Sequence, residues 1–98
     1  MLTTKQIAFL RSQAHHLNPT VLIGQQGLTE SIVTKISNEL EAHELIKVKF
    51  LEYKDQKRQL AATIVEETSC ELVTIIGNIA VLYREPRDLT RKKINLPL

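Results

Sequence analysis

The chain has 98 residues, of which 43% are hydrophobic and 24% charged, and its formal net charge is +2. A chain of this length buries one core, and no apolar run approaches the roughly 20 residues that span a bilayer, so we expect a single globular domain over residues 1–98 with no membrane role. The N-terminal sequence MLTTKQIAFL lacks the apolar core and cleavage site of a secretory signal, which favours a cytoplasmic protein. The lone cysteine, Cys70, excludes internal disulfides and cysteine-based zinc clusters and predicts a small buried side chain.

The first two predicted elements are a helix and a short strand. Thr3 and Gln6 fit a capping box, and the helical pattern that follows stops at Asn18 and Pro19. The apolar residues at helical spacing are Ile7, Leu10, Ala14 and Leu17. The β-branched run TVLIG, residues 20–24, is bounded by proline and glycine and predicts a strand.

A second helix and a second strand follow. Thr29 can cap a helix that carries one apolar stripe to about His43. In LIKVKF, residues 45–50, apolar and basic residues alternate, which predicts a strand with one face in the core. Lys47 and Lys49 then lie on the other face, with both ammonium groups in solvent.

The remaining elements complete the fold class. A third helix is predicted from about residue 55 to 68, followed by the strands ELVTII and IAVLYR with Gly77 and Asn78 as their hairpin turn. Helices between strands favour parallel pairing through right-handed crossovers, whereas a hairpin is antiparallel. We therefore expect an α/β (α+β) domain of order α-β-α-β-α-β-β, with a mixed four-stranded sheet packed with helices.

The loop between the first strand and the second helix contains two of the three glycines, Gly24 and Gly27, separated by Gln25 and Gln26. Such a loop can present backbone N–H groups to a phosphate at the positive end of the helix dipole. The longer nucleotide signatures GxxxxGK[ST] and GxGxxG are absent, which argues against a free nucleotide. The short pattern is equally compatible with a structural turn in which Gly24 ends the strand and Gly27 makes the bend.

Basic side chains gather locally although the net charge is small. Residues 84–98 carry five basic and two acidic side chains, and Lys47 and Lys49 share a strand face. These features suit a phosphate backbone, although a solvated strand face and a soluble tail give the same pattern. The histidines lack a metal spacing and no serine lies in a nucleophile elbow, so we expect no enzyme, metal or cofactor. Too few aromatic residues are present for an extended base-stacking platform, namely Phe9, Phe50, Tyr53 and Tyr83.

Three blocks of sequence carry a family resemblance: HHLNPTVLIGQQGLTESIV, EAHELIKVKF and VTIIGNIAVLYR. In this order they resemble the CRM domain, named for chloroplast RNA splicing and ribosome maturation, in its stand-alone bacterial YhbY-like form. The resemblance implies RNA binding, association with precursors of the large (50S) ribosomal subunit, and a fold like the C-terminal domain of translation initiation factor three with an added N-terminal helix. The RNA-contacting residues it implies are the loop residues Gly24, Gln25, Gln26, Gly27 and Thr29, and the basic residues Lys5, Arg11, Lys47, Lys49 and Arg84.

The chain departs from the family pattern between the two glycines. The family often has a basic residue there, whereas this chain has Gln25 and Gln26, so charge must come from neighbouring lysines and arginines. We expect a monomeric RNA-binding assembly factor acting on ribosomal RNA, with residues 85–98 as a basic tail and no RNA contact beyond Lys93. The alternative is a protein-interaction module that binds an acidic protein partner, with both glycines purely structural.

Overall fold

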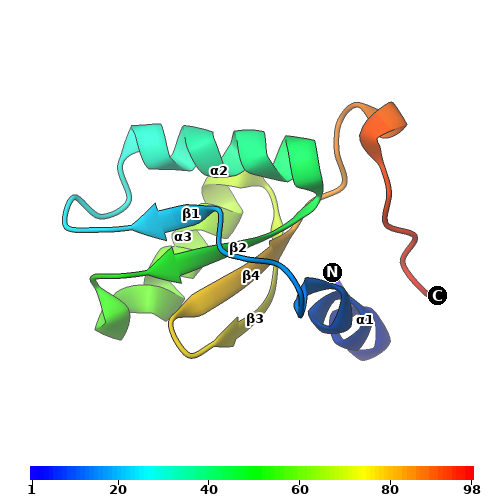
Figure 1. Ribbon diagram of the computed structural model, residues 1–98, viewed down its shortest axis with the longest axis horizontal. Helices are drawn as coiled ribbons and strands as arrows, with labels where there is room; N and C mark the ends of the chain where they lie inside the picture. Colours follow the sequence, from blue (N-terminus) through cyan, green and yellow to red (C-terminus); the bar gives the residue numbers. More distant parts are fainter.

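The computed structural model describes residues 1–98 and contains three α-helices, a four-stranded sheet and two 3-10 turns (Figure 1). The predicted order of helices and strands is confirmed. The elements are α1 (Thr4–Ala14), β1 (Val21–Ile23), α2 (Glu30–His43), β2 (Leu45–Phe50), η1 (Lys54–Gln56), α3 (Lys57–Thr68), β3 (Glu71–Ile76), β4 (Ile79–Tyr83) and η2 (Leu89–Arg91). None of the helices combines the length and the apolar character that a bilayer crossing requires.

The strands form one mixed sheet in the order β1-β2-β4-β3. β1 and β2 are parallel, as expected for strands joined by α2, and β4 is antiparallel to both of its neighbours. β4 thus inserts between β2 and β3. The hairpin turns at Gly77, whose φ of +57° is readily adopted by glycine.

The helices divide between the two faces of the sheet (Figure 1). α2 and α3 cover one face, and the alternating residues Ile46, Val48 and Phe50 of β2 enter the core that they form. The burial of these three side chains is the predicted one. α1 covers only part of the other face, where a second, smaller core forms. Its buried members are Leu10, Ala14, Leu45, Val73, Val81 and Tyr83.

Both predicted helix caps are present. The Thr3 hydroxyl accepts the Gln6 N–H at 3.1 Å, and the Gln6 side-chain oxygen accepts the Thr3 N–H at 3.0 Å, so the capping box of α1 is complete. The Thr29 hydroxyl accepts the Ile32 N–H at 3.1 Å and caps α2. The prediction for α1 was wrong at its end, because the helix stops at Ala14 and leaves Leu17 in the exposed connection to β1.

The C-terminal segment, residues 85–98, returns to the α1 side of the sheet (Figure 1). Glu44, only 2% exposed, accepts the N–H groups of Lys93 and Ile94 on one carboxylate oxygen. Ile94 and Leu96 pack against the second core, so the segment is docked rather than free in solvent. Cys70 is buried, and desolvation raises the pKa of its thiol, which agrees with a structural role.

Candidate nucleic-acid interface

The glycine loop is a tight turn with one glycine in a left-handed conformation. The Gly27 N–H donates to the Gly24 carbonyl at 3.0 Å, and Gly27 has a φ of +71°. A Cβ added at Gly27 would also lie 3.4 Å from the ring of Tyr53, whereas one added at Gly24 would meet nothing within 4 Å. Gly27 therefore has the backbone conformation that favours glycine, and the space around Gly24 is open to an approaching ligand.

Several backbone donors of this loop remain free. Among the amides that follow β1, those of Gln25, Gln26 and Leu28 have no acceptor within the chain. They precede α2, a helix of 14 residues that begins at Glu30. Free amides ahead of a helix N-terminus can bind an anion such as a phosphate oxygen, although the exposed carboxylate of Glu30 offsets part of the helix dipole.

Tyr53 holds the loop from the opposite side. Its hydroxyl donates to the Gln25 carbonyl at 2.5 Å, and its own backbone is left-handed, with φ 57° and ψ 36°. Tyr53 was not predicted as a site residue. The available signal was an isolated aromatic residue in the polar run EYKDQ, just after a buried strand. Its contact with Gln25 depends on a separation of 28 residues, which no local pattern reports.

Lys47 and Lys49 lie on the face of the sheet that α1 leaves partly open. Lys49 is exposed and pairs with Leu22 of β1, the strand that leads into the glycine loop. Lys47 is half-buried, and its ammonium donates to the Leu17 carbonyl at 2.9 Å. The prediction of a solvated face thus holds for Lys49, whereas Lys47 is tied to the connection after α1.

Arg11 of α1 adds a cation beside Lys47. It lines, with Lys47, an open hollow of about 760 Å³ between α1 and the sheet, and His15 and His16 lie at the same hollow. Lys5 is exposed near the start of α1 but does not line the hollow. The fold therefore brings Arg11 and Lys47 to one hollow. Lys49 lies two positions further along β2, on the same face but outside the hollow, and Lys5 lies on α1 outside it.

Arg84 has a different environment from the one expected. Its side chain is only 11% exposed, and its guanidinium donates to the Ser37 hydroxyl at 3.0 Å, to the Ser37 carbonyl at 2.8 Å and to the Thr68 carbonyl at 2.8 Å. Glu41 lies 3.8 Å away as its ion-pair partner. These bonds join α2 to the end of α3, so Arg84 serves the fold and we leave it out of the interface.

Glu41 connects the same region to the C-terminal segment. The backbone N–H groups of Asp88 and Arg87 donate to its carboxylate at 3.0 and 2.8 Å. These two hydrogen bonds, with a smaller contribution from Arg84, hold the pKa of Glu41 below its ordinary value of 4.5. No group of three or more histidine, cysteine, aspartate or glutamate side chains is arranged to hold a metal ion.

Comparisons with known proteins identify the family of this chain. The profile of the CRS1 / YhbY (CRM) domain matches residues 2–84. A Haemophilus influenzae protein named "RNA-binding protein" is 47% identical over 97 residues, covering 98% of this chain and 95% of that protein. A Bacillus subtilis protein named "Probable RNA-binding protein YqeI" is 43% identical over 98 residues, covering 99% of this chain and 100% of that protein. The solution structure of a Staphylococcus aureus protein superposes on this chain with a TM-score of 0.83 at 45% identity, over 99% of this chain and 100% of that one. Because the domain profile matches most of the chain and the relatives are more than 40% identical, the chain belongs to the CRS1 / YhbY (CRM) domain family.

Proposed function

We propose that this protein is an RNA-binding ribosome assembly factor that holds ribosomal RNA in precursors of the large (50S) subunit. RNA binding is supported by membership of the CRM domain family and by the names of the relatives from Haemophilus influenzae and Bacillus subtilis. These names describe binding proteins and not enzymes. The ribosomal target rests on the resemblance to the stand-alone bacterial members of the family. A cytoplasmic monomer suits that role.

The observation that carries the proposal is the set of free amides in the glycine loop beside an exposed lysine. A phosphate on the amides of Gln25, Gln26 and Leu28 would lie at the end of β1, whose neighbour β2 carries Lys49. The two glutamine side chains are exposed and can donate to phosphate oxygens or to a 2′-hydroxyl. Backbone contacts of this kind position a protein on RNA without reading its sequence.

The charge that holds the backbone comes from outside the loop. Lys47, Lys49 and Arg11 form a strip from β2 to α1, and each cation that meets a phosphate releases condensed counterions. Three such contacts predict that the logarithm of the affinity falls with the logarithm of the salt concentration with a slope of about −2 to −3.

A second candidate is a protein-interaction module with an acidic partner. It is favoured by two exposed apolar side chains on the same open face as the lysines, Leu22 at 51% and Ile76 at 53% exposure. If these apolar side chains, and not the ion pairs with the lysines, carry most of the affinity for that partner, the binding has a shallow salt dependence, because burial of apolar area is little affected by screening.

The test is a titration with RNA and DNA of equal length at several salt concentrations, followed by co-sedimentation with precursor and mature large subunits. Lys47→Gln with Lys49→Gln is compared with Lys35→Gln with Arg58→Gln, a matched pair that removes equal charge from exposed positions on α2 and α3. The proposal expects a steep salt slope, preferential association with the precursor particles, and weaker binding only for the β2 pair. Equal behaviour of the two pairs would contradict it.

A further inference from the structure

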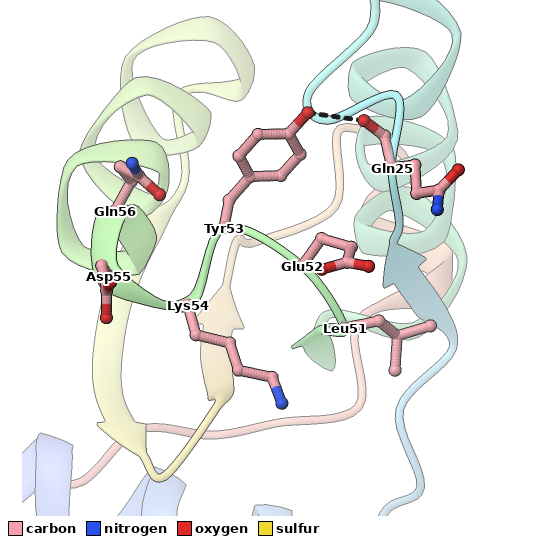
Figure 2. Close-up of a pocket in the computed structure, with 7 residues that line it drawn as sticks. All are labelled: Gln25, Leu51, Glu52, Tyr53, Lys54, Asp55 and Gln56. Carbon is pink, nitrogen blue, oxygen red and sulfur yellow. Dashed lines mark hydrogen bonds between the residues drawn. The ribbon is translucent and has the colours of Figure 1, made fainter.

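A cavity beside the glycine loop is not used by the backbone contacts described so far. It is open, measures about 750 Å³ and lies between the loop and the segment that follows β2. Figure 2 shows Gln25 at the upper right and the residues from Leu51 to Gln56 running from below it to the left, with the Tyr53 ring rising toward the loop. The residues that line the cavity follow β1 and β2, and these two strands end at the same end of the sheet in Figure 1.

The cavity has a fixed wall. The N–H groups of Leu51 and Glu52 both donate to the Ile23 carbonyl, at 2.9 and 3.2 Å, so the segment after β2 is attached to the end of β1. Tyr53 follows in a left-handed conformation that side-chain-bearing residues rarely adopt. Its hydroxyl is bonded to the Gln25 carbonyl and its ring lies against Gly27, yet 43% of the residue is exposed. An aromatic side chain with a fixed orientation thus lines the cavity and is partly exposed.

The charges at the cavity do not suit a phosphate. Its lining includes Glu52 and Asp55 against one cation, Lys54, which gives a net charge of −1 (two acidic groups and one basic). The other polar groups are the side-chain amides of Gln25 and Gln56. A ring, two amides and two carboxylates match an unpaired nucleobase, which stacks on aromatic side chains and is read through hydrogen bonds at its edge.

The carboxylates favour a base that presents hydrogen-bond donors. Guanine offers an N–H and an amino group side by side on its Watson–Crick edge, a pair of donors that one carboxylate can accept together. Uracil offers a single N–H between two carbonyl oxygens, which a carboxylate repels on both sides. Adenine and cytosine each offer an amino group and so rank between them.

We infer that this cavity binds one unstacked base of the RNA, guanine in preference to uracil, with Tyr53 as the stacking residue. This inference rests on the proposed RNA binding. The phosphate next to that base would lie on the free amides of the glycine loop, because Gln25 belongs to both the loop and the cavity wall. The loop then fixes the backbone while the cavity selects the nucleotide.

The chain supplies its own optical probe. It contains no tryptophan and two tyrosines, and Tyr83 is only 5% exposed, so a ligand that quenches tyrosine fluorescence reports on Tyr53. The probes are short single-stranded RNAs made of uridine with one central guanosine, one central uridine or one central abasic ribose. We expect the guanosine RNA to quench the fluorescence and to bind about tenfold more tightly than the abasic RNA, since one stacked base contributes roughly five- to 160-fold.

Two variants separate stacking from support of the loop. Tyr53→Phe keeps the ring but loses the hydroxyl bond to Gln25, and it should keep the preference for guanosine over the abasic site. Tyr53→Leu loses the ring and should bind the guanosine and abasic RNAs equally, with circular dichroism confirming that it is folded. If the parent protein binds the guanosine, uridine and abasic RNAs alike with an unchanged steep salt slope, the base cavity is refuted while phosphate binding stands. If the parent protein bound none of the three RNAs, the proposed function itself would be refuted.

Discussion

Substitution at the two loop glycines separates the conformation of the turn from its contact with phosphate. Gly27 has a φ of +71°, where an L-residue costs about 1–2 kcal/mol, and its added Cβ would lie at ordinary contact distance, 3.4 Å, from Tyr53. Gly27→Ala should therefore fold, with a melting temperature lower by about 5–15 °C for a domain of this size. Gly24 has no positive φ and open space around it, so Gly24→Ala should change stability by less than about 0.5 kcal/mol.

The aspartate variants then add a charge at each site. A carboxylate about 5 Å from a bound phosphate costs about 0.8 kcal/mol in water and more where water is excluded, which predicts at least a three- to fivefold loss of RNA affinity for Gly24→Asp without loss of stability. Gly27→Asp should lose both stability and affinity. Gln25→Ala and Gln26→Ala should lose only about 0.5–1.5 kcal/mol of binding each, because they remove a single hydrogen bond.

The assay is thermal unfolding together with RNA binding at fixed low salt, measured on each alanine and aspartate variant. The comparison of Gly24→Ala with Gly24→Asp isolates the charge, because neither substitution strains the turn. The reasoning would be refuted if Gly24→Asp and a folded Gly27→Asp bound ribosomal RNA as tightly as the parent. The loop would then be a structural turn only, and the interface would lie on β2 and α1.

The other predictions concern the basic side chains of β2 and the partly buried ion pair between Arg84 and Glu41. Lys47→Glu with Lys49→Glu should lower RNA affinity more than tenfold while unfolding free energy falls by about 1 kcal/mol or less, and the same exchange at Lys35 should leave RNA binding unchanged. Lysine in Arg84→Lys cannot form the three guanidinium hydrogen bonds of arginine, so chemical denaturation should show an unfolding free energy lower by about 2–4 kcal/mol. The RNA affinity per folded molecule should be unaltered. A reduced affinity with full stability would show that Arg84 belongs to the interface. Because the pKa of Glu41 is lowered in the folded state, its contribution is complete above its ordinary value of 4.5 and is lost as the pH falls below it. The parent should therefore lose more stability than Glu41→Gln in urea unfolding between about pH 6 and about pH 3.5, and parallel losses would exclude this role.

Local patterns in the sequence were sufficient for the elements of this fold. The capping box at Thr3, the alternation in residues 45–50 and the hairpin at Gly77 each depend on neighbours a few positions apart, and each was predicted and is confirmed. The lengths of the connections between the strands were enough to predict that all four strands form one mixed sheet. These lengths did not predict that β4 lies between β2 and β3, because the pairing of β2 with β4 depends on the complementarity of side chains that are distant in the sequence.

The candidate site was predictable only where it is continuous in the chain. The turn from Gly24 to Gly27 was singled out by its spacing, and Gly27 makes the bend with a φ of +71°. Arg84 was taken for a surface cation because a sequence does not tell a solvated arginine from one bonded to two helices. Tyr53 was missed for the same reason, since its role depends on a hydrogen bond across 28 positions.

The docked C-terminal segment has a consequence for how the ends of this chain behave. Terminal helices usually fray first, yet α1 shares its apolar contacts with Ile94 and Leu96, and the Gln6 side chain donates to the Pro97 carbonyl across 91 positions. Glu44 attaches the same segment to the end of α2 through its buried carboxylate. Opening either end exposes one common apolar surface, so the two termini form a single cooperative unit whose protection from exchange and proteolysis rises and falls together.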